Sequence, residues 1–140
     1  MVTFKRFALT KENKPLLHRL QKACLPDDRP YFPTNGAYWL GYDRDTPIAF
    51  CIAAPSVRWA DTMYLGRAGV LPSHRGQGLQ KRMILIRERW ARRNGYVWSI
   101  TDTADNPASA NSLIKKGYRM FNPSKPWGLD YSVYWRKKLM

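Results

Sequence analysis

A strand-like apolar segment, a short loop with two glycines and an amphipathic segment follow one another directly between residues 62 and 93. The apolar segment ends at Val70, the glycines are Gly76 and Gly78, and the amphipathic segment begins at Leu79. This order predicts a strand, a loop and the N-terminus of a helix. The first N–H groups of a helix have no partner inside the helix and carry positive potential. We therefore expect the loop to bind phosphate.

The loop has the composition that such a site needs. Gly76 and Gly78 have no side chain to block phosphate oxygens, and Arg75 adds a charge-assisted donor. It is not a Walker A loop, because no Gly-Lys-Ser/Thr follows at the required spacing. It is not the GxGxxG fingerprint, because Leu79-Gln80-Lys81 supplies no third glycine. A helix-opening loop without a ligand remains the alternative for this pattern alone.

Length and composition limit the number of domains, the location and the metal sites that the chain can have. The 140 residues predict one domain over residues 1–140, and the 44% apolar residues are enough for a core. The sequence has no apolar run that would span a membrane and no signal-peptide core at Met1–Leu9, so the cytoplasm is the expected location. Cys24 and Cys51, with His18 and His74, form neither a disulfide framework nor a zinc site, and we predict no metal.

The net charge is +14. A surface this basic attracts polyanions such as nucleic acid, an acidic protein or a phosphorylated cofactor. The charges are spread along the chain and form no arginine-rich tail, so nucleic acid is considered but not expected. A basic surface that serves only solubility is the other interpretation.

Hydrophobic periodicity and turn residues predict ten helices and strands in the order βαβββαβαββ. The predicted strands are 2–7, 37–42, 48–54, 62–70, 96–101, 118–121 and 131–139, and the predicted helices are 11–23, 79–93 and 107–116. Such an order indicates an α/β (α+β) fold with a mixed sheet. The glycines Gly66 and Gly69 also make a bulge plausible in the fourth strand.

The helix over residues 79–93 has the clearest pattern, with Leu79, Met83, Ile86 and Trp90 at helical spacing. Its outer face is predicted to carry the basic residues Lys81, Arg82, Arg87, Arg89, Arg92 and Arg93. Thr10 is a candidate cap for the first helix, and Asn106 followed by Pro107 is the predicted start of the third. Gly95 and Gly117 are the expected stops of the second and third helices.

Two motifs, in this order, resemble the GNAT superfamily of acetyl-CoA-dependent N-acetyltransferases. The first is Val70-x-Pro72-x-x-Arg75-Gly76-x-Gly78, and the second runs from Asn106-x-x-Ser109 to Lys116-Gly117-Tyr118. Residues 62–118 carry the specific match, whereas residues 1–61 match only in the order of elements. The RGxGLQ loop and the Tyr-Trp-Arg-Lys segment near the C-terminus are most similar to small bacterial and phage members.

The resemblance implies a strongly twisted mixed sheet of about six to seven strands, with helices on both faces and splayed central strands. It also implies acetyl-CoA as acetyl donor, with the pyrophosphate on N–H groups of the loop and the pantetheine arm along residues 65–71. An N–H near Val70 would then hold the oxyanion. The residues expected to bind the cofactor are Ala68, Val70, Leu71, Arg75, Gly76, Gln77, Gly78, Leu79, Gln80, Asn106 and Ser109. Asn106 serving only as a helix cap is the alternative.

The sequence departs from the family pattern at two positions. Gln80 stands where the family usually has Gly or Ala, and Leu113 stands where many members have a tyrosine that protonates the leaving thiolate. A thiol with a pKa of about 8.5 can leave without that acid. For the base, Asp61, Asp102 and Tyr64 are the candidates, and Asp102, acting through water, is the preferred one. A solvent-facing turn acid is the competing interpretation of Asp102.

The acceptor side carries less information. The resemblance implies a pocket built by residues 26–39 and by the last hairpin, and the aromatic residues there are Tyr31, Phe32, Tyr38, Trp39, Trp127, Tyr131 and Trp135. Half or more of these are expected to be core or rim residues. The predicted function is acetyl transfer from acetyl-CoA to a primary amine of an unidentified acceptor. The alternative is a basic nucleic-acid-associated protein that binds acyl-CoA without catalysis. Residues 131–139 are apolar enough for a homodimer contact.

Overall fold

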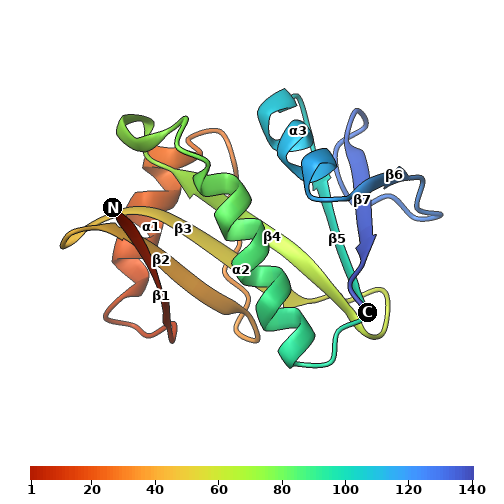
Figure 1. Ribbon diagram of the computed structural model, residues 1–140, viewed down its shortest axis with the longest axis horizontal. Coiled ribbons are helices and arrows are strands. Elements are labelled where there is room, and N and C mark those ends of the chain that lie inside the picture. Colours follow the sequence, from red (N-terminus) through yellow and green to blue (C-terminus); the bar gives the residue numbers. More distant parts are fainter. The chain divides into compact units, whose positions relative to one another are not determined.

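The computed structural model describes all residues from Met1 to Met140 (Figure 1). The elements are, in chain order, β1 (Val2–Phe7), α1 (Lys14–Cys24), β2 (Ala37–Asp43), β3 (Thr46–Pro55), β4 (Thr62–Val70), the 3₁₀ turn η1 (Pro72–His74), α2 (Leu79–Arg93), β5 (Trp98–Thr103), α3 (Pro107–Lys115), β6 (Arg119–Phe121) and β7 (Val133–Lys138). Hydrogen-bonded strands follow the order β1-β2-β3-β4-β5-β7-β6 in one seven-stranded sheet. The predicted α/β fold class with a mixed sheet is confirmed.

Every predicted helix and strand is present, and β1, β4 and α2 have the predicted bounds. The first helix is the main correction, because it begins at Lys14 and not at Lys11. Residues 11–13 form a turn in which Thr10 and Asn13 each accept a hydrogen bond from the other's backbone N–H, at 3.2 and 2.8 Å. Thr10 therefore caps this turn and not the helix. Pro15 then suits the first turn of α1, where its missing N–H leaves nothing unsatisfied.

The chain divides into two compact units, which are described separately. The N-terminal unit comprises residues 1–54 and 66–83, and the C-terminal unit comprises residues 55–65 and 84–140. Strand β4 and helix α2 each contribute residues to both units. One domain over residues 1–140 stays a prediction.

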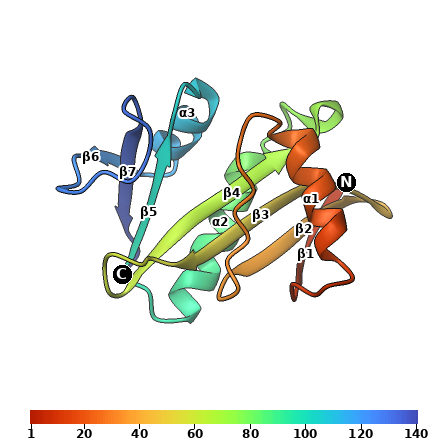
Figure 2. The same ribbon diagram turned by 180° about the vertical axis from the view of Figure 1, so that it is seen from behind.

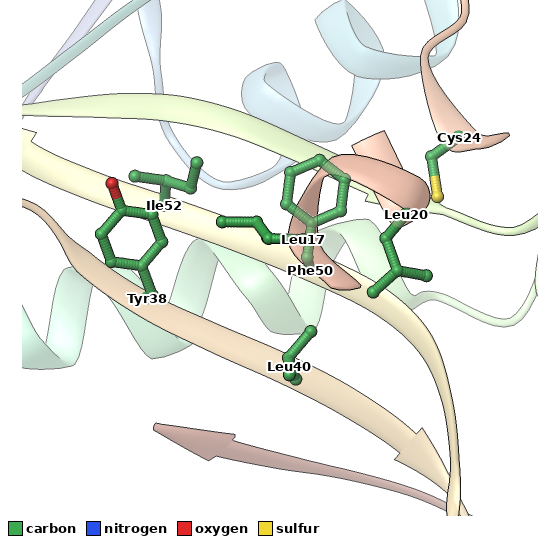
Figure 3. Close-up of a cluster of buried hydrophobic side chains, with 7 residues drawn as sticks. All are labelled: Leu17, Leu20, Cys24, Tyr38, Leu40, Phe50 and Ile52. Carbon is green, nitrogen blue, oxygen red and sulfur yellow. The ribbon is translucent and has the colours of Figure 1, made fainter. Parts of the chain in front are cut away.

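The N-terminal unit is built on the antiparallel strands β1, β2 and β3. Helix α1 crosses β2 and β3 (Figure 2) and buries Leu17, Leu20 and Cys24 against the sheet. Figure 3 shows these side chains with their partners Tyr38, Leu40, Phe50 and Ile52. The partners are alternate residues of β2 and β3, because alternate side chains of a strand point to the same face.

The other face of this sheet meets the start of α2. Phe4 and Gly41 are paired on β1 and β2, and the Arg82 guanidinium lies 5.0 Å from the centre of the Phe4 ring. Arg82 also donates a hydrogen bond of 3.0 Å to the Val2 carbonyl. Within this unit, helices therefore cover both faces of the sheet, as predicted.

Gly69 has a packing reason. A Cβ atom at Gly69 would lie 2.5 Å from Cβ of Cys24 and 3.0 Å from the Phe50 ring. The end of α1 therefore packs directly against the backbone of β4. A bulge in β4 stays a prediction, whereas a register shift is present between Gly41 and Tyr42 of β2.

The C-terminal unit contains β5, β6, β7 and α3, with the first residues of β4 (Figure 1). Strand β4 pairs with β5 in parallel, including Tyr64 opposite Ile100, while β5–β7 and β6–β7 are antiparallel. At the next position, the Thr101 hydroxyl donates a hydrogen bond of 3.0 Å to the Leu65 carbonyl. Splaying of the central strands stays a prediction.

Helix α2 buries two charged residues in this unit. Glu88 is 0% exposed and accepts hydrogen bonds of 3.0 and 3.1 Å from Nζ of Lys137 on β7. Arg87 is 3% exposed, so its predicted place on the outer face of the helix is wrong. None of the helices has the length and apolar composition that a membrane span requires.

Candidate functional site

The loop between β4 and α2 has the backbone shape that its glycines predict. We call residues 71–78 the glycine loop. It begins with η1, and Gly76 and Gly78 both adopt positive φ angles, of 79° and 75°. A Cβ atom at either glycine would meet nothing within 4 Å. The glycines are therefore required by backbone conformation, and the space around them is open to a ligand.

The end of this loop presents a row of unused donors. The backbone N–H groups of residues 76–80 make no hydrogen bond within the chain, and the first bond of the helix runs from the Arg82 N–H to the Gly78 carbonyl at 3.2 Å. Helix N-termini with free N–H groups bind anions, because the helix dipole adds to the donors. The predicted binding residues Gly76, Gln77, Gly78, Leu79 and Gln80 therefore form a row that fits a phosphate.

Arg75 makes two hydrogen bonds within the chain, and its contact with phosphate stays a prediction. Its Nε donates to the Val70 carbonyl and its Nη2 donates to the Cys24 carbonyl, both at 3.1 Å. Two of the donors expected for phosphate thus hold the loop against β4 and the end of α1. In this conformation, Arg75 therefore holds the loop in place through hydrogen bonds within the chain.

His74 connects the glycine loop to the end of β2. Its Nε2 lies 2.7 Å from Oδ2 of Asp43 at the end of β2, and its Nδ1 lies 2.7 Å from the hydroxyl of Ser73. The hydrogen bond from His74 is the largest cause that lowers the pKa of Asp43. His74 is therefore held between the carboxylate of Asp43 and the hydroxyl of Ser73.

The remaining predicted residues of this segment lie at the end of β4. Ala68 is half-buried and Val70 is buried. The Leu71 N–H donates a hydrogen bond of 2.8 Å to the Ile48 carbonyl, so that donor is occupied. Burial raises the pKa of the nearby Cys24 thiol to about 11, which keeps it protonated at neutral pH. Cys24 is therefore no nucleophile here.

The second motif forms the start of α3 in the C-terminal unit. Oδ1 of Asn106 accepts a hydrogen bond of 3.1 Å from the Ser109 N–H, which confirms the predicted cap. Asn106 is exposed and Ser109 is half-buried. Leu113, at the position of the family's tyrosine, is 5% exposed and packs as a core residue. Cofactor binding by Asn106 and Ser109 stays a prediction.

The two candidate catalytic residues are neighbours in the C-terminal unit. The Tyr64 hydroxyl donates a hydrogen bond of 2.9 Å to Oδ1 of Asp102. The indole N–H of Trp127 donates to the same oxygen at 3.0 Å. Oδ2 of Asp102 makes no hydrogen bond within the chain, and the residue is only half-buried. One oxygen is thus held in place and the other is available.

Trp127 is the residue whose role the sequence could not indicate. Its ring centre lies 4.5 Å from that of Tyr134 and 5.9 Å from that of Trp59, so its orientation is fixed by aromatic contacts. The sequence places Trp127 among the aromatic residues of the acceptor side but says nothing of a hydrogen bond to Asp102, 25 positions away. No local pattern signals such a pair.

The other aromatic residues predicted for the acceptor side divide into two groups. Tyr38, Trp39 and Trp135 are buried, at 2%, 6% and 4% exposure, so they belong to the cores of their units. Burial raises the pKa of Tyr38 to about 12, and its hydroxyl donates to the Pro33 carbonyl. Tyr31 and Tyr131 are exposed. Phe32 is half-buried and packs against the core of the N-terminal unit. The expectation that half or more of these residues are core or rim residues is therefore confirmed.

Comparison with known proteins identifies the family. The family model described as the Acetyltransferase (GNAT) family matches residues 7–118. The chain therefore belongs to the GNAT acetyltransferase family and is an acetyltransferase by class. Acyl-CoA is the donor that this family uses. No curated protein sequence matches the chain.

Solved structures have the same fold at low identity. A GNAT-family acetyltransferase from Desulfovibrio desulfuricans has a TM-score of 0.78 and 13% identity, with 100% of each chain covered. A Bacillus subtilis acetyltransferase in complex with CoA has a TM-score of 0.76 and 14% identity, with 100% of each chain covered. The ribosomal-protein-S18-alanine N-acetyltransferase of Escherichia coli has a TM-score of 0.76 and 12% identity, over 98% of this chain and 94% of that one.

Proposed function

We propose that this chain transfers an acetyl group from acetyl-CoA to a primary amine of an acceptor, by direct attack of the amine in a ternary complex. The observation that carries the proposal is the row of free N–H groups at residues 76–80, which fits a phosphate-bearing donor. Family membership supports the reaction class. The solved complex of a similar fold with CoA supports the donor.

The row of N–H groups would hold the donor's pyrophosphate. The open space at Gly76 and Gly78 would allow its oxygens to approach the backbone. His74 and Arg75 would act indirectly, because their hydrogen bonds to Asp43 and to the Cys24 carbonyl keep the loop in its present shape. Acetyl-CoA supplies the thioester carbonyl that the amine attacks.

Asp102 would remove the proton from the incoming ammonium. An alkyl amine has a pKa of about 10 and is protonated at neutral pH, so it must lose a proton before it can attack. Oδ2 of Asp102 is available for this proton, directly or through one water molecule. Tyr64 and Trp127 hold Oδ1 and so direct Oδ2. Leu113 donates nothing, and a thiol with a pKa of about 8.5 leaves without a general acid.

Two measurements test this proposal. Isothermal titration at low salt measures acetyl-CoA binding to the wild type and to the Gly78→Glu variant, whose carboxylate would repel phosphate at the loop. Thiol release from acetyl-CoA, with a panel of primary amines, measures turnover. We expect binding by the wild type, weak or absent binding by the variant, and amine-dependent thiol release. Absence of acetyl-CoA binding by the wild type would refute the proposal. Tight binding without turnover of any amine would favour the non-catalytic alternative.

A further inference from the structure

One face of the C-terminal sheet combines aromatic rings with arginines. Asp102 of β5 pairs with Tyr134 of β7, and Ile100 pairs with Arg136 two residues away. Directly paired residues of neighbouring strands point to the same face, and so do alternate residues along a strand. Asp102 and Arg136 therefore share a face. We call it the arginine–aromatic face and define it by Arg58, Trp98, Asp102, Phe121, Trp127 and Arg136.

Both arginines of this face lie over aromatic rings. The Arg136 guanidinium is 4.9 Å from the centre of Phe121 and 5.6 Å from the centre of Trp98. The Arg58 guanidinium is 5.6 Å from the centre of Trp127. A guanidinium that stacks on a ring keeps its N–H donors at the edge, where they can form a fork to a carboxylate or phosphate.

Neither arginine has an acidic partner in the chain. The salt bridges of the structure involve Asp43 and Glu88, and both lie elsewhere. Arg58 and Arg136 are exposed, so their donors are accessible. Two positively charged forks are therefore held in position and left uncompensated.

A further arginine adds to the uncompensated positive charge. Arg119 of β6 stands directly opposite Arg136 of β7, and both are exposed. Like charges at directly opposite positions of two strands destabilise the pair. No carboxylate of the chain forms an ion pair with either residue. A bound anion would remove this repulsion, which makes an anionic ligand the partner that the charges favour.

The same face carries one carboxylate. Oδ2 of Asp102 is available, as described above, and Cα of Asp102 lies about 7 Å from Cα of Ile100, the residue paired with Arg136. Trp127 links the two parts of the face, since its N–H holds Asp102 and its ring lies under Arg58. The face thus presents a negative group for an ammonium and, on the same side of the sheet, positive groups for an anion.

We propose that the acceptor is an amine that carries an anionic group, a carboxylate or a phosphate, at the end remote from the amine. The ammonium end meets Oδ2 of Asp102, and the anionic end meets Arg58 and Arg136. This inference rests on the proposed function, because it takes Asp102 as the site of the amine. It adds the class of acceptor, which neither the family nor the similar structures specify.

Four short alkyl amines that differ at the far end test the inference. Pentylamine is neutral there, 1,5-diaminopentane is cationic, and 5-aminopentanoate and 4-aminobutyl phosphate are anionic. Binding is measured by tryptophan fluorescence, to which Trp98 and Trp127 of this face contribute. Turnover is measured separately by thiol release from acetyl-CoA. The two anionic probes show whether carboxylate or phosphate is preferred.

We expect at least one anionic amine to bind about tenfold more tightly than pentylamine, and the diamine to bind most weakly. Arg136→Gln and Arg58→Gln should each remove most of this preference. Arg89→Gln is the matched control, because Arg89 is exposed on α2 and belongs to no part of this face. Thermal melts of all variants establish that they are folded.

The outcomes separate the inference from the proposed function. Equal affinities for all four amines, or a preference that both glutamine variants retain, would overturn the inference even if amines are acetylated. A preference for anionic amines that the glutamine variants lose, with no thiol released from any of them, would support the anion site and count against the proposed function.

Discussion

Nε2 of His74 lies 2.7 Å from Oδ2 of Asp43. This contact joins the glycine loop to the end of β2, on a segment far away in the sequence. Together with the bonds from Arg75 to the Val70 and Cys24 carbonyls, it fixes the loop from both sides. The row of free N–H groups at residues 76–80 therefore begins from a loop that is held by contacts within the chain.

The Asp43–His74 contact predicts a pH-dependent stability. The hydrogen bond from His74 lowers the pKa of Asp43 below the usual value of about 3.9, with smaller contributions from the N-terminal amine and Arg44. A carboxylate whose pKa is lowered by folding stabilises the folded state above the unfolded-state pKa. This contribution is lost as the pH falls through the lower folded-state value. Urea unfolding between pH 6 and pH 3 measures it.

We expect Asp43→Asn to be less stable than the wild type at pH 6, with a difference that shrinks below about pH 4. Asp45→Asn is the control, because Asp45 lies in the same turn, is exposed and makes no ion pair. A constant difference between Asp43→Asn and the wild type over the whole pH range would contradict this prediction.

Alanine substitutions at two glycines should have similar effects on stability but different effects on acetyl-CoA binding. An alanine at Gly78 would meet no atom within 4 Å, but it would have to adopt a φ of 75°. This strain costs about 1 kcal/mol. Gly95, at the end of α2, has the same open surroundings and a φ of 81°. The two alanine variants should therefore lose similar free energies of unfolding, and only Gly78→Ala should bind acetyl-CoA more weakly in an isothermal titration. Equal affinities in both variants would place the phosphate elsewhere.

Local patterns predicted most of the fold. The helix Leu79–Arg93 has the predicted bounds, because its start is marked by a glycine loop and its end by Gly95. The cap of α3 by Asn106 was also predictable, since the cap and its partner are three residues apart. In each case, the determining residues lie within one or two turns of one another.

Contacts between distant residues were not predictable. Glu88 is a polar position on a basic helix, and its burial is accompanied by hydrogen bonds from Lys137, which lies 49 residues later in the chain. The hydrogen bond from Trp127 to Asp102 depends in the same way on how a loop packs. Arg75 was expected at the phosphate because it is a charge-assisted donor in the RGxG motif, whereas two of its donors bond to the Val70 carbonyl and to the Cys24 carbonyl at the end of α1. Sequence spacing contains none of this information.

Substitutions of Asp102 and of its two hydrogen-bond donors, Tyr64 and Trp127, should lower activity by different amounts. Asp102→Asn removes the proton acceptor, so we expect kcat/KM for the amine to fall by about 100-fold or more, with unchanged acetyl-CoA affinity. Trp127→Phe and Tyr64→Phe keep the rings and remove one hydrogen bond each. Each should cost about tenfold, which is the effect of one hydrogen bond to a charged group. Steady-state thiol release measures these values.

Asp105→Asn is the control for Asp102→Asn. Asp105 is exposed and has a φ of 48°, a conformation that asparagine adopts readily. It should therefore retain wild-type activity. If Asp102→Asn and Asp105→Asn acetylate the amine at the same rate, Asp102 is not the base.

The buried pair of Glu88 and Lys137 predicts strong coupling between two substitutions. Glu88 is fully buried, and its two oxygens accept hydrogen bonds from one ammonium group. Lys137→Met leaves the fully buried Glu88 with only the more distant Arg92, at 3.8 Å, so it should lower the free energy of unfolding by about 3 kcal/mol. Glu88→Gln should cost less, because the Lys137 side chain is partly exposed. The double variant should lose much less than the sum of the two, because no uncompensated charge remains. Urea unfolding of the wild type and the three variants measures the coupling. Lys138→Met is the control, because Lys138 is exposed at the next position, and it should change the free energy of unfolding by less than about 0.5 kcal/mol. Losses that simply add would mean that the two residues contribute independently.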